Sequence, residues 1–185
     1  PTVESIGRGA FGYKKTQKRA TFVGNAPALG EAAFGEAADS FTVYWHEGRE
    51  GFTAPTWQGY AAWMIPKGPE IAVYQPRGFE LVDGSGKKSY GGQQVGTKTP
   101  PRTVTIRNRG SKVLRGLFVT TGGNHPEDFI IRQPEERSLP PGAVTTFKVS
   151  FKPNAKGARN ATIRIHSNDA DEDPFEIHFD GHGVK

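Results

Sequence analysis

The sequence has no cysteine, which excludes disulfide scaffolds, thiolate zinc sites and cysteine nucleophiles. It also lacks a long apolar run, since the longest, residues 60–65, is far shorter than the roughly 20 residues of a membrane-spanning helix. The sequence begins at Pro1 without a basic and apolar leader, so we predict no signal peptide within this piece. We expect it to be a processed or truncated piece of a longer protein.

Turn-forming and aromatic residues are abundant. The 24 Gly and 14 Pro among 185 residues make long helices unexpected. The 12 Phe, 5 Tyr and 3 Trp compensate for a hydrophobic fraction of only 35% because each ring contributes a large apolar area. The composition therefore predicts a folded, turn-rich chain with a sizeable core.

Charge divides the chain into two predicted domains. Residues 1–66 carry six Lys/Arg and six Asp/Glu, whereas residues 67–185 carry 18 and 13 and hold the whole net charge of +5. Residues 65–69 (Ile-Pro-Lys-Gly-Pro) block both helix and ladder continuation at the same place. We therefore predict domains 1–66 and 67–185.

The first domain contains an internal repeat. Residues 6–12 recur as residues 29–35 with an offset of 23, and the same offset carries residues 20–23 onto residues 43–46. The repeat predicts a unit of strand, turn and short helical turn that places an Ala-Phe pair inward. A period of 23 lies within the range of stacked leucine-rich-repeat coils.

Residues 5–11, 22–27, 41–45 and 51–60 resemble the closing coils of a BspA-type leucine-rich repeat protein of the bacterial cell surface, a likeness that covers residues 3–65. The resemblance implies the end of a partial solenoid. Only about two coils are present, and stacks of this kind need three or more, so we expect further coils before residue 1.

The second domain shows strict alternation of apolar and polar residues, the period of half-buried antiparallel strands. About seven short strands follow, at residues 71–74, 103–107, 114–119, 129–132, 146–151, 161–166 and 175–180. The expected fold class is thus mainly β: a leucine-rich-repeat solenoid end followed by a seven-stranded antiparallel immunoglobulin-like β-sandwich.

Residues 69–73, 102–110, 139–142 and 179–183 resemble the choice-of-anchor D domains, relatives of the ASPM/SPD-2/Hydin immunoglobulin-like modules, over residues 69–184. For function, the resemblance implies a spacer or docking unit in a large surface protein. The expected location is extracellular or the cell envelope of a bacterium.

A weak calcium candidate lies in the loop after residue 166. Asp169, Asp171 and Asp173 alternate as carboxylate ligands do in a calcium loop, but Pro174 occupies the position that requires glycine. The favoured interpretation is a solvated acidic hairpin between residues 161–166 and 174–180. This hairpin, with residue numbers summing to about 340, places Arg164 opposite Glu176 and Thr162 opposite His178.

No other pattern predicts a metal site, a cofactor or catalysis. The five histidines are scattered along the chain, and Gly84-Ser85-Gly86 is interpreted as a flexible turn because it lacks the G-x-S-x-G pattern of a nucleophile elbow. We predict a protein that is not an enzyme.

Aromatic residues cluster between residues 41 and 63. The favoured interpretation is that they close the repeat stack, and the alternative is an exposed binding surface. The candidate residues of that binding surface are Tyr44, Trp45, Trp57, Tyr60 and Trp63.

The sequence thus predicts a non-catalytic bacterial surface or secreted module that presents a repeat surface for protein binding. One alternative is a carbohydrate-binding accessory module that uses Trp45, Trp57 and Trp63; another is a self-assembling envelope or filament subunit that associates through the N-terminal coil. The basic stretches 14–19 and 102–115 lack interleaved aromatics, so we predict no nucleic-acid partner.

Overall fold

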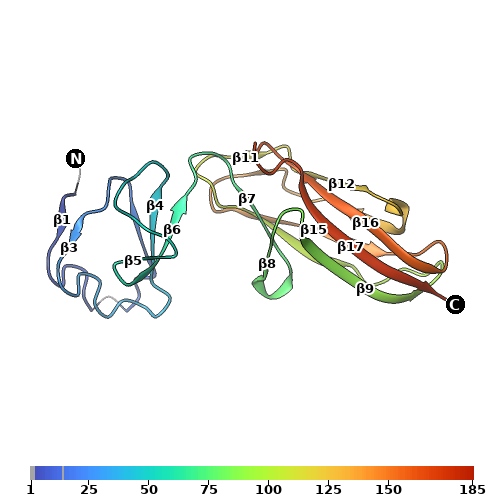
Figure 1. The fold of residues 1–185 in the computed structure, drawn as a ribbon, viewed down its shortest axis with the longest axis horizontal. Helices are drawn as coiled ribbons and strands as arrows, with labels where there is room; N and C mark the ends of the chain where they lie inside the picture. The colour runs from blue at the N-terminus through green and yellow to red at the C-terminus, as the bar shows by residue number, and fades with distance from the viewer. Residues whose placement is uncertain (1–2, 14) are drawn as a thin grey trace. The chain divides into compact units, whose positions relative to one another are not determined.

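The computed structural model describes residues 3–13 and 15–185, and the chain divides into two compact units, residues 1–67 and 68–185 (Figure 1). The described helical elements are two short 3-10 turns, η1 (Pro76–Gly78) and η2 (Pro126–Asp128). Within the described residues, no helix has the length and apolar character needed to cross a membrane. Both units are therefore built from strands and turns, as the glycine and proline content predicts.

The first unit contains two small sheets. A two-stranded parallel sheet pairs β1 with β3, and a second sheet has the order β2-β4-β6-β5. The strands are β1 (Ser5–Ile6), β2 (Arg19–Phe22), β3 (Ala28–Leu29), β4 (Thr42–His46), β5 (Thr56–Trp57) and β6 (Tyr60–Ile65).

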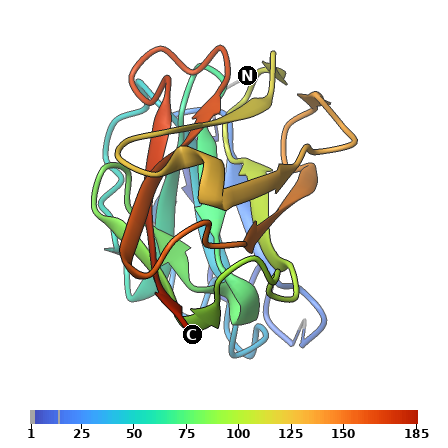
Figure 2. The same ribbon diagram turned by 90° about the vertical axis from the view of Figure 1, so that its right-hand side faces the viewer.

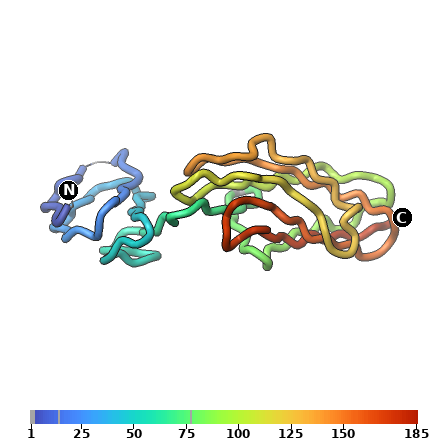
Figure 3. Tube along the Cα trace, turned by 90° about the horizontal axis from the view of Figure 1, so that it is seen from above, coloured from blue at the N-terminus to red at the C-terminus, as the bar shows by residue number. Residues whose placement is uncertain are grey.

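The 23-residue repeat sets the register of both sheets. Ser5 pairs with Ala28 in one sheet, and Ala20 pairs with Val43 in the other, each across a parallel ladder. The first segment, residues 3–24, pairs through β1 and β2 with β3 and β4 of the second segment, residues 26–48; Figure 3 traces the described parts of both in blue shades. The predicted offset between these strands is confirmed.

The predicted leucine-rich-repeat solenoid is not supported. The 23-residue offset is used once in each sheet, and the next parallel pair, Thr42 with Ala61, has an offset of 19. The sheet then ends on β5, which pairs antiparallel with β6. The two separate sheets do not form a solenoid, because a solenoid requires like coils stacked at one repeating offset.

Aromatic rings form the core of the first unit. Ala33 and Phe34 of the second segment are buried, as the repeat predicts, whereas the equivalent Phe11 is 41% exposed and stacks on the Phe34 ring. The buried members of this core are Ala33, Phe34, Phe41, Val43, Trp45, Trp57 and Ala62. Closely spaced rings thus supply most of the apolar area of a unit with few aliphatic residues.

The second unit is a β-sandwich with one sheet in the order β13-β15-β10-β7-β8 and another in the order β12-β16-β17-β9, beside a small pair of β11 and β14. Its strands are β7 (Ile71–Tyr74), β8 (Glu80–Leu81), β9 (Gly86–Gln94), β10 (Arg102–Asn108), β11 (Leu114–Arg115), β12 (Phe118–Gly122), β13 (Phe129–Arg132), β14 (Ser138–Leu139), β15 (Val144–Phe151), β16 (Gly157–His166) and β17 (Phe175–Val184).

Alternating side chains of both sheets fill the sandwich core. Phe147 and Phe151 from β15 are buried together with Phe175 and Phe179 from β17. The predicted hairpin register is confirmed: Arg164 pairs with Glu176, and Thr162 pairs with His178. The strands are longer than predicted, because β16 begins at Gly157 instead of residue 161 and β17 ends at Val184 instead of residue 180.

The sandwich differs from the predicted seven antiparallel strands, because β8, β9 and β14 lie outside the predicted ranges. The predicted strand 114–119 is divided into β11 and β12, and the predicted flexible turn at Gly86 begins β9. β9 pairs parallel with β17, and the two strands end together beside the label C in Figure 2. The sequence of β9 is rich in glycine and polar residues and lacks apolar alternation, so strand propensity does not reveal it.

Candidate functional site

Carboxylates from distant parts of the second unit converge at one end of the sandwich. Glu70 precedes β7, whereas Asp169 and Asp171 lie in the loop between β16 and β17. One ligand atom from each of these three side chains lies within 4.8 Å of the others. Asp169 is 1% exposed, and its Oδ2 accepts the backbone N–H of Ile71 at 2.7 Å.

The environment of this acidic cluster favours the protonated forms. Burial, followed by the charges of Glu70, Asp169, Asp83 and Asp171, raises the pKa of Glu172 to about 7. Burial is also the main cause that raises the pKa of Asp169, and the neighbouring Asp171 adds to it. Hydrogen bonding from Ile71 N–H opposes that rise, because it stabilises the charged form of Asp169.

The cluster only partly matches the predicted calcium ligands. Asp169 and Asp171 come together, but Asp173 instead accepts the backbone N–H of Ser167 at 3.1 Å and lies 3.5 Å from His166 Nδ1. Glu70 takes the third place, and no sequence spacing reveals it, because it lies 99 positions before Asp169 in the chain. Three carboxylates are oxygen donors of the type that Ca²⁺ accepts, but they are fewer than its usual six to eight ligands.

A groove of about 370 Å³ lies beside this cluster, lined by both acidic and apolar side chains. Arg109 and Glu80 both line it and form a bidentate pair, with both N–O distances 2.7 Å. The Arg109 guanidinium also lies 5.5 Å from the centre of the Tyr74 ring. The remaining acidic lining residues are Glu70, Asp83 and Glu172.

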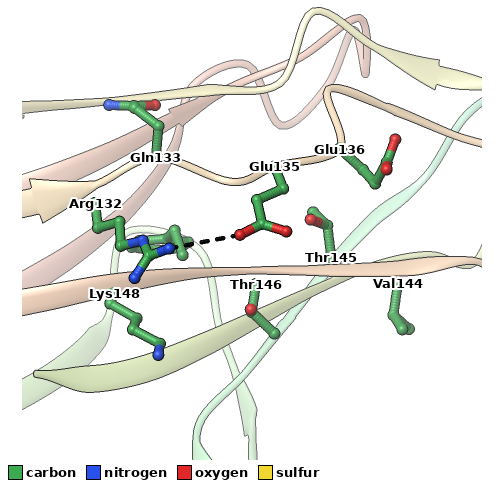
Figure 4. Close-up of a pocket in the computed structure, with 9 residues that line it drawn as sticks. Arg132, Gln133, Glu135, Glu136, Val144, Thr145, Thr146 and Lys148 are labelled. Atoms are coloured by element: carbon green, nitrogen blue, oxygen red, sulfur yellow. Dashed lines mark ion pairs between the residues drawn. The ribbon is translucent and has the colours of Figure 1, made fainter.

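A second groove, of about 330 Å³, runs along β15 where β13 ends (Figure 4). Arg132 and Glu135 form an ion pair of 3.6 Å at its edge, and Lys148 lies beside Arg132. Thr145 and Thr146 provide the hydroxyl groups of the lining, and no histidine lines this groove. The lining therefore combines cationic, anionic and hydroxyl side chains.

Two histidines occupy the outer face of the sheet that contains β16. His166 Nε2 lies 3.2 Å from Thr120 Oγ1, and its ring stacks on Phe118 with 4.4 Å between centres. His178 lies 3.3 Å from Thr162 Oγ1, its partner across the hairpin. Neither groove is lined by these histidines, so the hydroxyl–imidazole contacts lie outside both concave sites.

The candidate aromatic surface is divided between core and exterior. Trp45 and Trp57 are buried at 6% and 4% exposure, and Trp57 Nε1–H donates to the Gly51 carbonyl at 2.8 Å. Tyr44 and Tyr60 are half-buried, and Trp63 is 52% exposed. Only one of the three tryptophans is therefore available for stacking on a ligand, whereas the other two hold the first unit together.

Buried polar and charged side chains stabilise the turns of the second unit. Asp128 is fully buried; its Oδ2 lies 2.5 Å from Arg159 Nε, and its Oδ1 accepts the Asn154 backbone N–H at 3.0 Å. The buried Asn108 joins its own turn to the segment at Leu139, because its Nδ2 donates to the Lys112 and Leu139 carbonyls while its Oδ1 accepts the Gly110 N–H. These groups fix turns and point into neither groove.

The alternating layers, sheet orders and aromatic core define an immunoglobulin-like β-sandwich. Residues 91–182 match the model of the HYDIN/CFA65/VesB-like, Ig-like domain family, slightly less than half of the chain. The predicted Hydin-like, immunoglobulin-like character is thus supported for the second unit. The match does not reach the first unit, and no comparison supports the leucine-rich-repeat resemblance.

Solved structures with similar folds include a protein of unknown function from Porphyromonas gingivalis W83, at 17% identity and TM-score 0.48, over 66% of this chain and 54% of that one. The VesB protease of Vibrio cholerae has 14% identity and TM-score 0.43, over 52% of this chain and 30% of that one. The ASH/PapD-like domain of human CEP192 has 11% identity and TM-score 0.37, over 62% of this chain and 85% of that one. The chain therefore spans about half the length of the first of these proteins. A comparison with curated proteins gives no match.

Proposed function

We propose that the chain is a non-catalytic accessory module of a larger bacterial surface or secreted protein. In this proposal, the sandwich is a spacer, and the first unit presents a surface for protein binding. The observation that carries it is the use of the buried polar groups: Asp128, Asn108 and Asp169 are all engaged in hydrogen bonds that fix turns and strand ends. The match of residues 91–182 to an Ig-like domain family supports the same function.

Unpaired buried polar groups are a common sign of a catalytic or binding site. Among the described residues, no buried side-chain nitrogen or oxygen lacks a hydrogen-bond partner. The two grooves instead carry exposed ion pairs, Arg109 with Glu80 and Arg132 with Glu135. In this proposal, the module functions through its shape and through the position it gives to its neighbours, and not through a catalytic side chain.

The test is a comparison of turnover and location. The purified chain is assayed with peptide and glycoside substrates, and antibodies locate the full-length protein in fractions of the source bacterium. We expect no turnover and a signal in the envelope or secreted fraction. Turnover that is lost in a variant of a groove residue, such as Glu172→Gln, would overturn the proposal, and so would a purely cytoplasmic signal.

A further inference from the structure

The contact between the first and second segments of the first unit follows a fixed backbone pattern. Along the strands, the second segment donates to the first: Ala28 N–H to the Glu4 carbonyl at 2.9 Å, Gly30 N–H to Ile6 at 2.8 Å and Thr42 N–H to Lys18 at 3.0 Å. At the turns the direction reverses. The donors there are Gly9, Phe11 and Tyr13, and the acceptors are the carbonyls of Glu31, Ala33 and Gly35, at 2.8–3.1 Å.

The same groups recur on the opposite edge of the first segment. A shift of 23 residues maps the three donors of the second segment onto the N–H groups of Ser5, Gly7 and Arg19, and the three acceptors onto the carbonyls of Arg8, Ala10 and Gly12. Within residues 3–13 and 15–185, none of these six groups has a backbone partner. The edge therefore presents the pattern that the second segment presents to the first.

Side chains complete this pattern. Phe11 is 41% exposed on the edge. Its ring stacks on the ring of Phe34, the equivalent residue 23 positions later, with 5.4 Å between centres and 10° between planes. An incoming phenylalanine at the equivalent position would cover the open side of the Phe11 ring in the same way. Burial of that ring would add apolar area to a contact otherwise made by the backbone.

The two segments also have opposite charge. The first segment contains one acidic residue and five basic residues: Arg8, Lys14, Lys15, Lys18 and Arg19. The second segment contains four acidic residues and no lysine or arginine: Glu31, Glu36, Asp39 and Glu47. Arg8 Nε lies 3.3 Å from Glu31 Oε2 across the contact. Lys15, Lys18 and Arg19 are exposed, and Lys14 lies outside the described residues.

We propose that the free edge of β1 and β2 docks an acidic polypeptide segment that follows the 23-residue pattern of the second segment. The segment adds in parallel to both strands, donates to the carbonyls of Arg8, Ala10 and Gly12, and accepts the N–H groups of Ser5, Gly7 and Arg19. Strand addition gives affinity through the backbone, and the charge and the phenylalanine position give specificity. The exposed lysines and arginines discourage pairing with basic or apolar edges.

The test attaches the segment covalently, so that its effective concentration is high. A copy of residues 26–48 is placed directly before Val3, which preserves the 23-residue offset. Amide hydrogen exchange is then measured by NMR in the full chain with and without the copy. We expect exchange at Ser5, Gly7 and Arg19 to slow at least about tenfold, because the docked segment accepts these N–H groups.

Two matched variants separate docking from a general effect of extension. In one, Glu31, Glu36, Asp39 and Glu47 of the copy are replaced by lysine, and in the other, the copy is intact and Arg19 is replaced by glutamate. Both are expected to lose most of the added protection at low salt, because like charges then face each other. Equal protection in all three chains would overturn the proposed acidic chemistry.

Amides of β4 show whether the first unit remains folded in the extended chain. Protected β4 amides together with unchanged exchange at Ser5, Gly7 and Arg19 would overturn the proposal. Loss of β4 protection would overturn it too, because the copy would then compete with the native contact instead of docking. Concentration-dependent protection of the same edge in the unextended chain would identify a second copy of the protein as the occupant and would also contradict it.

Discussion

The carboxylate of Asp169 accepts the backbone N–H of Ile71 at 2.7 Å and so joins the loop after β16 to the first strand of the sandwich. The bond places a buried acid among Glu70, Asp171 and Glu172. Because these carboxylates repel one another when ionised, protonation of the cluster is coupled to the stability of this end of the sandwich.

The first prediction concerns pH. The pKa of Glu172 is raised in the folded protein from 4.5 to about 7, so the folded state binds more protons than the unfolded state between these values. The contribution of this residue to stability is therefore present at low pH and is lost as the pH rises through about 7. In Glu172→Gln, the urea midpoint should fall less between pH 5 and pH 8 than in the wild type. Glu136→Gln, at an exposed position, is the matched control and should retain the wild-type slope.

The second prediction concerns the buried amide of Asn108. Replacement by alanine leaves the Leu139 and Lys112 carbonyls and the Gly110 N–H without their partner. We expect Asn108→Ala to lower the free energy of unfolding by about 2–4 kcal/mol, because several polar groups lose hydrogen bonds at once. Urea denaturation provides the measurement. The exposed Asn124→Ala should change it by less than about 0.5 kcal/mol, and similar losses in the two variants would contradict the assigned role.

The third prediction separates the tryptophans. Trp57→Ala removes a buried ring and its hydrogen bond to Gly51, so it should destabilise the first unit by about 3–5 kcal/mol. Trp63→Ala removes a half-exposed ring and should cost less than about 1 kcal/mol. Both losses of stability are measured by chemical denaturation that is monitored through hydrogen exchange at the β4 amides. If Trp57→Ala leaves this exchange unchanged, the ring is not part of the core.

The fourth prediction concerns Gly181 in β17. A Cβ at this position would overlap Cε1 of the buried Phe151 ring, which cannot move away in a packed core. We expect Gly181→Ala to destabilise the sandwich by about 1–3 kcal/mol through overpacking. In the control Gly92→Ala, the nearest atom is Val184 Cγ1 at 3.4 Å, an ordinary contact. A thermal midpoint that drops equally in both variants would argue against the steric explanation.

Local patterns in the sequence predict much of the register. The 23-residue offset aligns Ala20 with Val43, and strict alternation aligns Arg164 with Glu176 across the hairpin. Both features are encoded within short stretches, because side chains on one face of a strand recur at every second residue. The immunoglobulin-like sandwich is predictable for the same reason.

Features that depend on contacts between distant residues are not predictable in this way. β9 is a strand because β17 offers its edge, although its own residues favour a loop. Glu70 joins Asp169 and Asp171 only because β7 begins beside the β16–β17 loop. The leucine-rich-repeat interpretation fails where the offset changes from 23 to 19, which the similarity of residues 6–12 and 29–35 does not reveal.

The position of β17 has a consequence for the order of folding. This strand lies between β16 and β9, so the last strand of the unit to leave the ribosome occupies the interior of its sheet. In that sheet β9 pairs only with β17 (Figure 1), so it stays unpaired there until the strands between them and β17 itself have been synthesised. Closure of the sandwich therefore follows the synthesis of β17 and is governed by long-range pairing.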